Sequence, residues 1–75
     1  MSILRGDQQE RIDNNFTYHA PKPGQPEKYQ QLRDKAKEFA LLIVDLTPES
    51  REQSIALTEL ETATFWANAA IARNE

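Results

Sequence analysis

The uneven distribution of helix-breaking residues constrains the fold of this chain more than any other feature. Both glycines and three of the four prolines lie within the first 26 residues, and Pro48 is the only later one. Proline removes a backbone donor and clashes with the preceding helical turn, and glycine destabilises a helix interior by about 1 kcal/mol. The sequence therefore predicts irregular structure early in the chain and two long helices on either side of Pro48.

Apolar side chains on both sides of Pro48 recur at three- and four-residue spacing, the period of an amphipathic helix. We therefore expect helices over about residues 26–46 and 48–74. The recurring face comprises Tyr29, Leu32, Ala36, Phe39, Ala40, Ile43 and Leu46, and then Ala56, Leu57, Leu60, Ala63, Thr64, Ala67 and Ile71.

The connection between the two helices is short, which makes them antiparallel neighbours. The second helix is expected to begin at a Thr47 N-cap followed by Pro48, and a capping box of Ser50 and Gln53 is the competing start. The predicted fold class is all-α, an antiparallel hairpin of two long helices preceded by a short arm or helix.

The first part of the chain divides into an arm and a loop. Residues 1–17 form the arm, in which Asp7 would cap a two-turn helix that stops at Asn14. Residues 18–25 form a loop that its prolines stiffen, so the hairpin domain is expected to span residues 18–75.

The apolar surface exceeds what one hairpin can cover. The chain has 75 residues and no cysteine, and a domain of this size buries only about 60% of its unfolded surface. Residues 39–44 are apolar on every side, and Phe65 and Trp66 project away from the stripe. We therefore expect a compact homo-oligomer. The alternative is that the arm folds back over Trp66 or Leu42.

Charge is segregated along the chain. Residues 18–37 carry a net charge of +3 and the remainder −6, which gives −3 overall. The acidic balance argues against a duplex nucleic-acid binder. The longest apolar run has six residues, far below the roughly 20 needed to cross a bilayer, and no signal-peptide core is evident. An intracellular protein without a membrane partner is expected.

The basic segment adjoins aromatic residues on the stiffened loop, a combination that holds a nucleobase beside its phosphate. The candidate ligand-binding residues in this part are Tyr18, His19, Lys22, Arg33 and Lys35. Each has a structural alternative. The basic residues would form a solvated helix face, Tyr18 a hydrophobic staple for the arm, and His19 a local hydrogen bond.

Four further candidates lie on the second long helix. Ser50 and Arg51 fall in its first turn, where free N–H groups favour an anion, although a plain cap is the alternative. Asn68 would hydrogen-bond to a polar edge of a ligand, or it would pair with Asn68 of a neighbouring copy of the chain. Arg73 would contact a ligand or stabilise the helix end. The sequence contains no carboxylate pair in an apolar setting, no glycine-rich phosphate loop and no metal-ligand spacing. A binding protein without catalytic residues, metal or cofactor is expected.

Four segments give the chain a resemblance to small phage proteins. They are FTYHAPKPG (16–24), KYQQLR (28–33), TPESRE (47–52) and FWANAAIARN (65–74). The chain resembles, over residues 13–75, the hairpin domain of anti-CBASS nucleotide sponges and Thoeris anti-defence sponges. The resemblance implies a homo-oligomer, a hexamer, that sequesters cyclic di- or trinucleotide messengers in the host bacterial cytoplasm without cleaving them. Cyclic ADP-ribose-type signals and a helical-hairpin protein-interaction module are the alternatives.

The resemblance also implies roles for individual residues. Tyr18 matches a loop tyrosine that stacks on a base, and Arg33 or Lys35 falls where the family places a phosphate-contacting lysine. Asn68 and Arg73 are the nearest matches to the last-helix residues of a separate trinucleotide site. Ala69 stands where that site would have its arginine.

Overall fold

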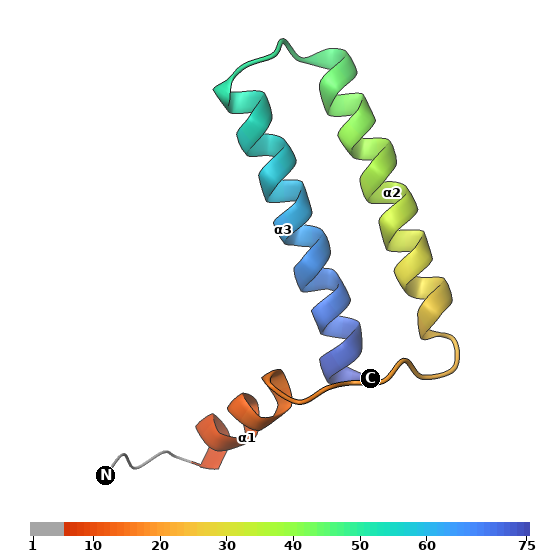
Figure 1. The fold of residues 1–75 in the computed structure, drawn as a ribbon, viewed down its shortest axis with the longest axis vertical. Helices are drawn as coiled ribbons and strands as arrows, with labels where there is room; N and C mark the ends of the chain where they lie inside the picture. The colour runs from red at the N-terminus through yellow and green to blue at the C-terminus, as the bar shows by residue number, and fades with distance from the viewer. Residues whose placement is uncertain (1–5) are drawn as a thin grey trace.

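The computed structural model describes residues 6–75, which form three helices (Figure 1). They are α1 (Gly6–Asn15), α2 (Gln25–Leu46) and α3 (Arg51–Asn74). The helices α2 and α3 run antiparallel, and α1 projects sideways from the open end of their hairpin. The all-α fold is confirmed. Residues 1–5 of the expected arm lie outside the described residues.

A glycine sets the beginning of α2. Gly24, the N-cap, has φ 85°, in the left-handed region that residues with a Cβ rarely adopt. The chain turns back there, so that the backbone N–H of Gln25 donates to the carbonyl of Lys22 at 3.0 Å. Pro26 lies in the first turn of α2, where its missing N–H costs no helical hydrogen bond. The helix thus begins one residue before the expected position.

The start of α3 corrects the expected boundary. The helix begins at Arg51 rather than Pro48, and Ser50 is its N-cap, whose hydroxyl accepts from the backbone N–H of Gln53 at 3.1 Å. The Thr47 hydroxyl instead donates to the carbonyl of Ile43 at 2.6 Å. Thr47 therefore terminates α2, and the competing Ser50–Gln53 signal marks the start of α3.

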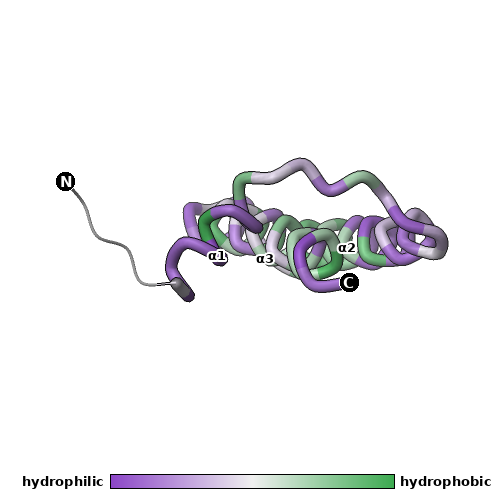
Figure 2. The backbone as a smooth tube through the Cα atoms, turned by 90° about the horizontal axis from the view of Figure 1, so that it is seen from below, coloured by the Kyte–Doolittle hydropathy of each residue, from purple (hydrophilic) through white to green (hydrophobic). Residues whose placement is uncertain are grey.

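The molecule is a flat plate rather than a globule. Its dimensions are 51 × 35 × 14 Å and its radius of gyration is 16.8 Å, against about 11 Å for a compact chain of this length. Viewed from the open end, α2 and α3 form a single layer (Figure 2). Two helices in one layer leave both broad faces uncovered.

The described chain has no apolar core. Among residues 6–75 no hydrophobic side chain is buried, and the one buried residue is Gln25. The helix α1 does not cover the surplus apolar surface, because Trp66 remains 63% exposed and Leu42 50% exposed. The described part of the arm therefore does not cover Trp66 or Leu42, contrary to the alternative considered above.

None of the helices within residues 6–75 combines the length and the apolar character needed to cross a membrane.

Candidate functional site

The loop of residues 16–24 crosses the end of α3 and stands off the plane of the two long helices (Figures 1 and 2). Its first part is fixed through α1. The Asn14 side-chain amide donates to the carbonyl of Arg73 at 3.0 Å. His19 Nε2 lies 2.7 Å from the carbonyl of Asn14. A carbonyl only accepts, so His19 is the donor and carries its proton on Nε2. In the chain as described, His19 makes a local hydrogen bond.

The second part of the loop is fixed by Gln25, a residue that the sequence did not single out. Its Oε1 accepts from the backbone N–H of Lys22 at 2.9 Å. Its Nε2 lies within hydrogen-bonding distance of the carbonyl of Ile71, at 3.5 Å, and of a carboxylate oxygen of Glu75, at 3.4 Å. One buried side chain thus joins the loop, the start of α2 and the end of α3.

Two lysines of the basic segment converge on Glu75. Lys28 Nζ forms an ion pair with the Glu75 carboxylate at 2.7 Å, and Lys22 Nζ donates to the main-chain oxygen of Glu75. The hydrogen bond from Lys28 is the largest cause of a lowered Glu75 pKa; partial burial opposes it, and the Gln25 bond and the charges of both lysines add to it. Both lysines therefore make contacts that join the loop and α2 to the end of α3.

This ion pair predicts acid sensitivity at the open end. The Glu75 pKa is lowered by folding from its usual value of 4.5. The contribution of the carboxylate to stability is therefore fully present above that pH, and is lost as the pH falls through the folded-state pKa. We expect Glu75→Gln to lower the melting temperature slightly at pH 7, and the difference from the wild-type protein to vanish in strong acid. Thermal unfolding of both proteins between pH 7 and 2.5 measures this. A constant difference across that range would contradict the assignment.

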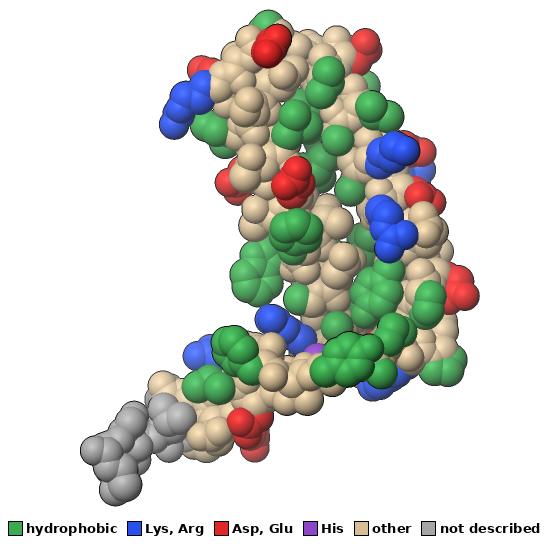
Figure 3. Space-filling view, viewed as in Figure 1, with side chains coloured by type: hydrophobic (Ala, Val, Ile, Leu, Met, Phe, Trp, Pro, Cys, Tyr) green, Lys and Arg blue, Asp and Glu red, His purple; other side chains and the backbone are tan. Residues whose placement is uncertain are grey.

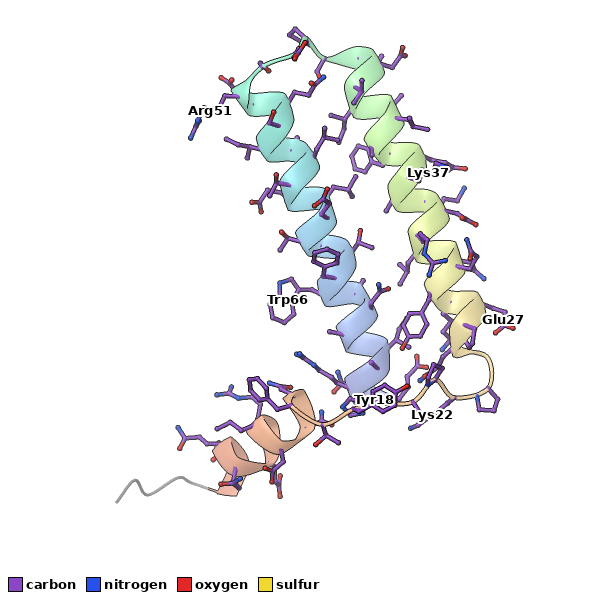
Figure 4. All side chains as sticks on the ribbon, in the orientation of Figure 1. Tyr18, Lys22, Glu27, Lys37, Arg51 and Trp66 are labelled. Carbon is purple, nitrogen blue, oxygen red and sulfur yellow. The ribbon has the colours of Figure 1, made fainter. Side chains whose placement is uncertain are left out.

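Tyr18 lies on the loop beside the end of α3, close to Lys22 (Figure 4). Its side chain is 84% exposed, which does not fit a hydrophobic staple within a single chain. The two ends of the loop are held by hydrogen bonds, so the ring is presented on a fixed segment. An exposed ring on a fixed loop is suited to stacking against a flat ligand.

A groove of about 300 Å³ runs between α2 and α3. Its rim carries Arg33 and Lys37 from α2 and Glu61 and Phe65 from α3, and its floor is mostly apolar. The face from which the loop stands off shows a hollow between the two helices with basic side chains over α2 (Figure 3). Cations and an aromatic ring over an apolar floor can hold a ligand that is both anionic and flat.

The structure separates the two candidate phosphate ligands. Arg33 lines the groove described above and donates to the side-chain oxygen of Gln30 at 2.8 Å. Lys35 lines a different groove, with Leu32, Phe39 and Ala63, and forms an ion pair with Glu38 at 3.1 Å. Side chains two positions apart on a helix project in very different directions. One chain therefore does not bring Arg33 and Lys35 to the same ligand.

A second, more polar groove of about 360 Å³ separates α1 from the end of α3. The guanidinium of Arg73 lies 5.8 Å from the centroid of the Trp66 ring, a cation–π distance. Arg11 lines the groove from α1, and Ala69 lines it from α3. The sequence did not single out Arg11, because only the packing of α1 brings it to Arg73.

The remaining candidates lie apart from the loop. Arg51 is at the opposite end of the hairpin from Tyr18 and Lys22 (Figure 4). The Ser50 hydroxyl is used within the chain, since it accepts from Gln53 and donates to the carbonyl of Pro48 at 3.0 Å. Asn68 is half-buried, and its Oδ1 is buried without a hydrogen-bond partner. A buried acceptor of this kind calls for a donor from outside the chain.

The chain matches one known family. The family model of the Acb2/Tad1 hairpin domain matches residues 8–72. No curated protein and no solved structure gives a significant match to the chain.

Proposed function

Because the chain belongs to the Acb2/Tad1 hairpin-domain family of phage anti-defence sponges, we propose that it binds and sequesters cyclic di- or trinucleotide messengers of bacterial immunity. The messenger is bound and not cleaved. Its removal from solution in the host cytoplasm keeps the downstream effector inactive. No cofactor takes part.

The exposed ring of Tyr18 on its anchored loop is the observation that carries this proposal. A cyclic dinucleotide presents two flat bases and two phosphates. Tyr18 would stack on one base, which is worth about 1–3 kcal/mol per base. The net charge of −3 does not oppose binding, because the local field at the site decides the interaction with phosphate.

Arg33 is the favoured phosphate ligand of the two basic candidates. It borders the groove between α2 and α3 together with Lys37, and the face on which the loop stands off shows basic side chains over α2 (Figure 3). Lys35 borders a different groove and is paired with Glu38. If Lys35 contacts the ligand, it does so from a neighbouring copy of the chain.

The working form of the protein is a homo-oligomer, which we propose to be a hexamer. The supporting observation is that residues 6–75 bury no hydrophobic side chain, so the hairpin needs copies of itself to form a core. Assembly would also bring together candidates that one chain keeps apart, such as Arg51 and Tyr18. Each symmetric interface would repeat the same ligand site.

A messenger panel tests the function directly. We expect at least one cyclic di- or trinucleotide to bind in calorimetry, and to raise the melting temperature by about 10–20 °C at a hundred times its Kd. Denaturing the complex should release the ligand with its mass unchanged. A panel without heat or thermal shift would contradict the proposal, and recovery of a linear product would indicate an enzyme.

Cyclic ADP-ribose-type signals are the second candidate, and the α1–α3 groove favours them. Arg11 and Arg73 offer two guanidiniums for a pyrophosphate, and Trp66 offers a ring for adenine. The same panel with these signals added distinguishes the two classes.

A further inference from the structure

The buried glutamine at the open end of the hairpin is chemically unusual. Gln25 is only 4% exposed, and hydrophobic side chains elsewhere in residues 6–75 are more exposed than it is. Burying a carboxamide is unfavourable by about 1–3 kcal/mol unless it is hydrogen-bonded. Gln25 meets this condition on both sides, since its oxygen accepts from Lys22 and its nitrogen faces the oxygens of Ile71 and Glu75. The buried Gln25 side chain therefore makes specific polar contacts between segments that are distant in the sequence.

The contact fixes one end of the ligand loop. Gln25 is held to the loop twice, through its backbone N–H to the Lys22 carbonyl at 3.0 Å and through its Oε1 to the Lys22 N–H at 2.9 Å. Its Nε2 then ties this turn to α3, and Lys28 holds the Glu75 carboxylate in place at 2.7 Å. The other end of the loop is tied to α3 through Asn14 and the carbonyl of Arg73. Tyr18 lies between these two anchors.

We propose that Gln25 and Glu75 form a clasp that positions Tyr18 for ligand binding, an inference that rests on the proposed function. Gln25 is a positioning residue and does not touch the ligand. Ordering a loop residue at the moment of binding costs about 1–2 kcal/mol of backbone entropy. A loop that the clasp has already ordered avoids this cost, so the clasp raises affinity without a contact of its own.

An added charge at Gln25 and its compensation at Glu75 test the clasp. Gln25→Glu keeps the acceptor for Lys22 but places a carboxylate against Glu75 and the Ile71 carbonyl, so the clasp should open. The double variant Gln25→Glu/Glu75→Gln restores a donor–acceptor pair with the roles exchanged. Gln31→Glu, at an exposed position on α2, is the matched control for an added charge.

Two readouts separate the clasp from the function. The first is hydrogen–deuterium exchange of residues 16–24, which needs no ligand; the second is the Kd of cyclic GMP–AMP. We expect Gln25→Glu to speed hydrogen exchange in the loop and to raise the Kd of cyclic GMP–AMP by about tenfold. This is the effect expected when about one more loop residue must be ordered on binding. The double variant should return both values to within about threefold of the wild-type protein, and Gln31→Glu should change neither. Exchange in α3 reports whether each variant is folded.

Each outcome is decisive for the clasp. Recovery in the double variant supports it, because a merely structural loss at Gln25 would not be repaired by a change at Glu75. Unchanged loop exchange in Gln25→Glu, or no recovery in the double variant, overturns it. If the wild-type protein binds no cyclic nucleotide, the proposed function fails, and loop exchange alone then decides whether the clasp orders the loop.

Discussion

Tyr18→Ala is expected to lower the affinity for a bound cyclic nucleotide by about 10- to 100-fold, because stacking of one base on an aromatic side chain is worth about 1–3 kcal/mol. The ring is 84% exposed in the chain, so its removal should leave the stability of the hairpin within about 0.5 kcal/mol of the wild-type value. Calorimetric titration measures the first quantity, and thermal unfolding without ligand measures the second.

The chain supplies a matched control two residues away. Phe16 is 86% exposed on the same segment, so Phe16→Ala removes an equally exposed ring from a different position. We expect Phe16→Ala and Tyr18→Phe to keep nearly full affinity. Full affinity in Tyr18→Ala would exclude the stacking role. If function then survives in Tyr18→Ala but is lost on substitution of Trp66, the protein-interaction alternative is favoured instead.

The helices could be predicted from the sequence because their causes are local. Residues that break helices are confined to the first 26 positions and Pro48, and the apolar period on either side is regular. The start of α3 was the exception, because the sequence offers two overlapping signals. Only the structure shows the Thr47 hydroxyl bonded to the Ile43 carbonyl, which leaves Ser50 as the N-cap.

The site was less predictable, because its geometry depends on contacts between distant segments. An exposed loop aromatic such as Tyr18 can be anticipated from its proline-rich surroundings. Gln25 cannot, since its partners on α3 are 46 and 50 residues away. The basic segment also divides into two groups that the sequence does not distinguish. Lys22 and Lys28 bond to Glu75. Arg33 and Lys37 are the members that border the groove between α2 and α3.

The assembly proposed above would explain why so little of the chain is buried. The resemblance carried by the FWANAAIARN ending is confirmed by the family match over residues 8–72. If the chain acts as a sponge, symmetric assembly of a small hairpin would provide many ligand sites from a short sequence. On this view the exposed apolar surface of one chain is the interior of the assembly. Folding and assembly should then be one process.

Leu42→Asp is therefore expected to dissociate the protein and to unfold it at the same time. Leu42 is 50% exposed in the chain, within the run that is apolar on every side. Full burial of a leucine contributes about 1.5–3 kcal/mol, and burial of an unpaired carboxylate costs far more, in every copy. Sedimentation should show the variant at the 8.6 kDa mass of one chain, with circular dichroism showing reduced helix content, because a hairpin without a core is not stable alone.

The wild-type protein provides the test of coupling between folding and assembly. Its melting temperature should rise with protein concentration, because mass action favours the folded oligomer. Gln31→Asp, at an exposed polar position on the same helix, should keep the wild-type mass, so that loss of the oligomer in Leu42→Asp is not due to an added charge alone. A wild-type chain that sediments as a monomer and melts cooperatively at a temperature independent of concentration would contradict the assembly. The separated candidates, Arg51 at one end of the hairpin and Tyr18 at the other, would then have no common ligand.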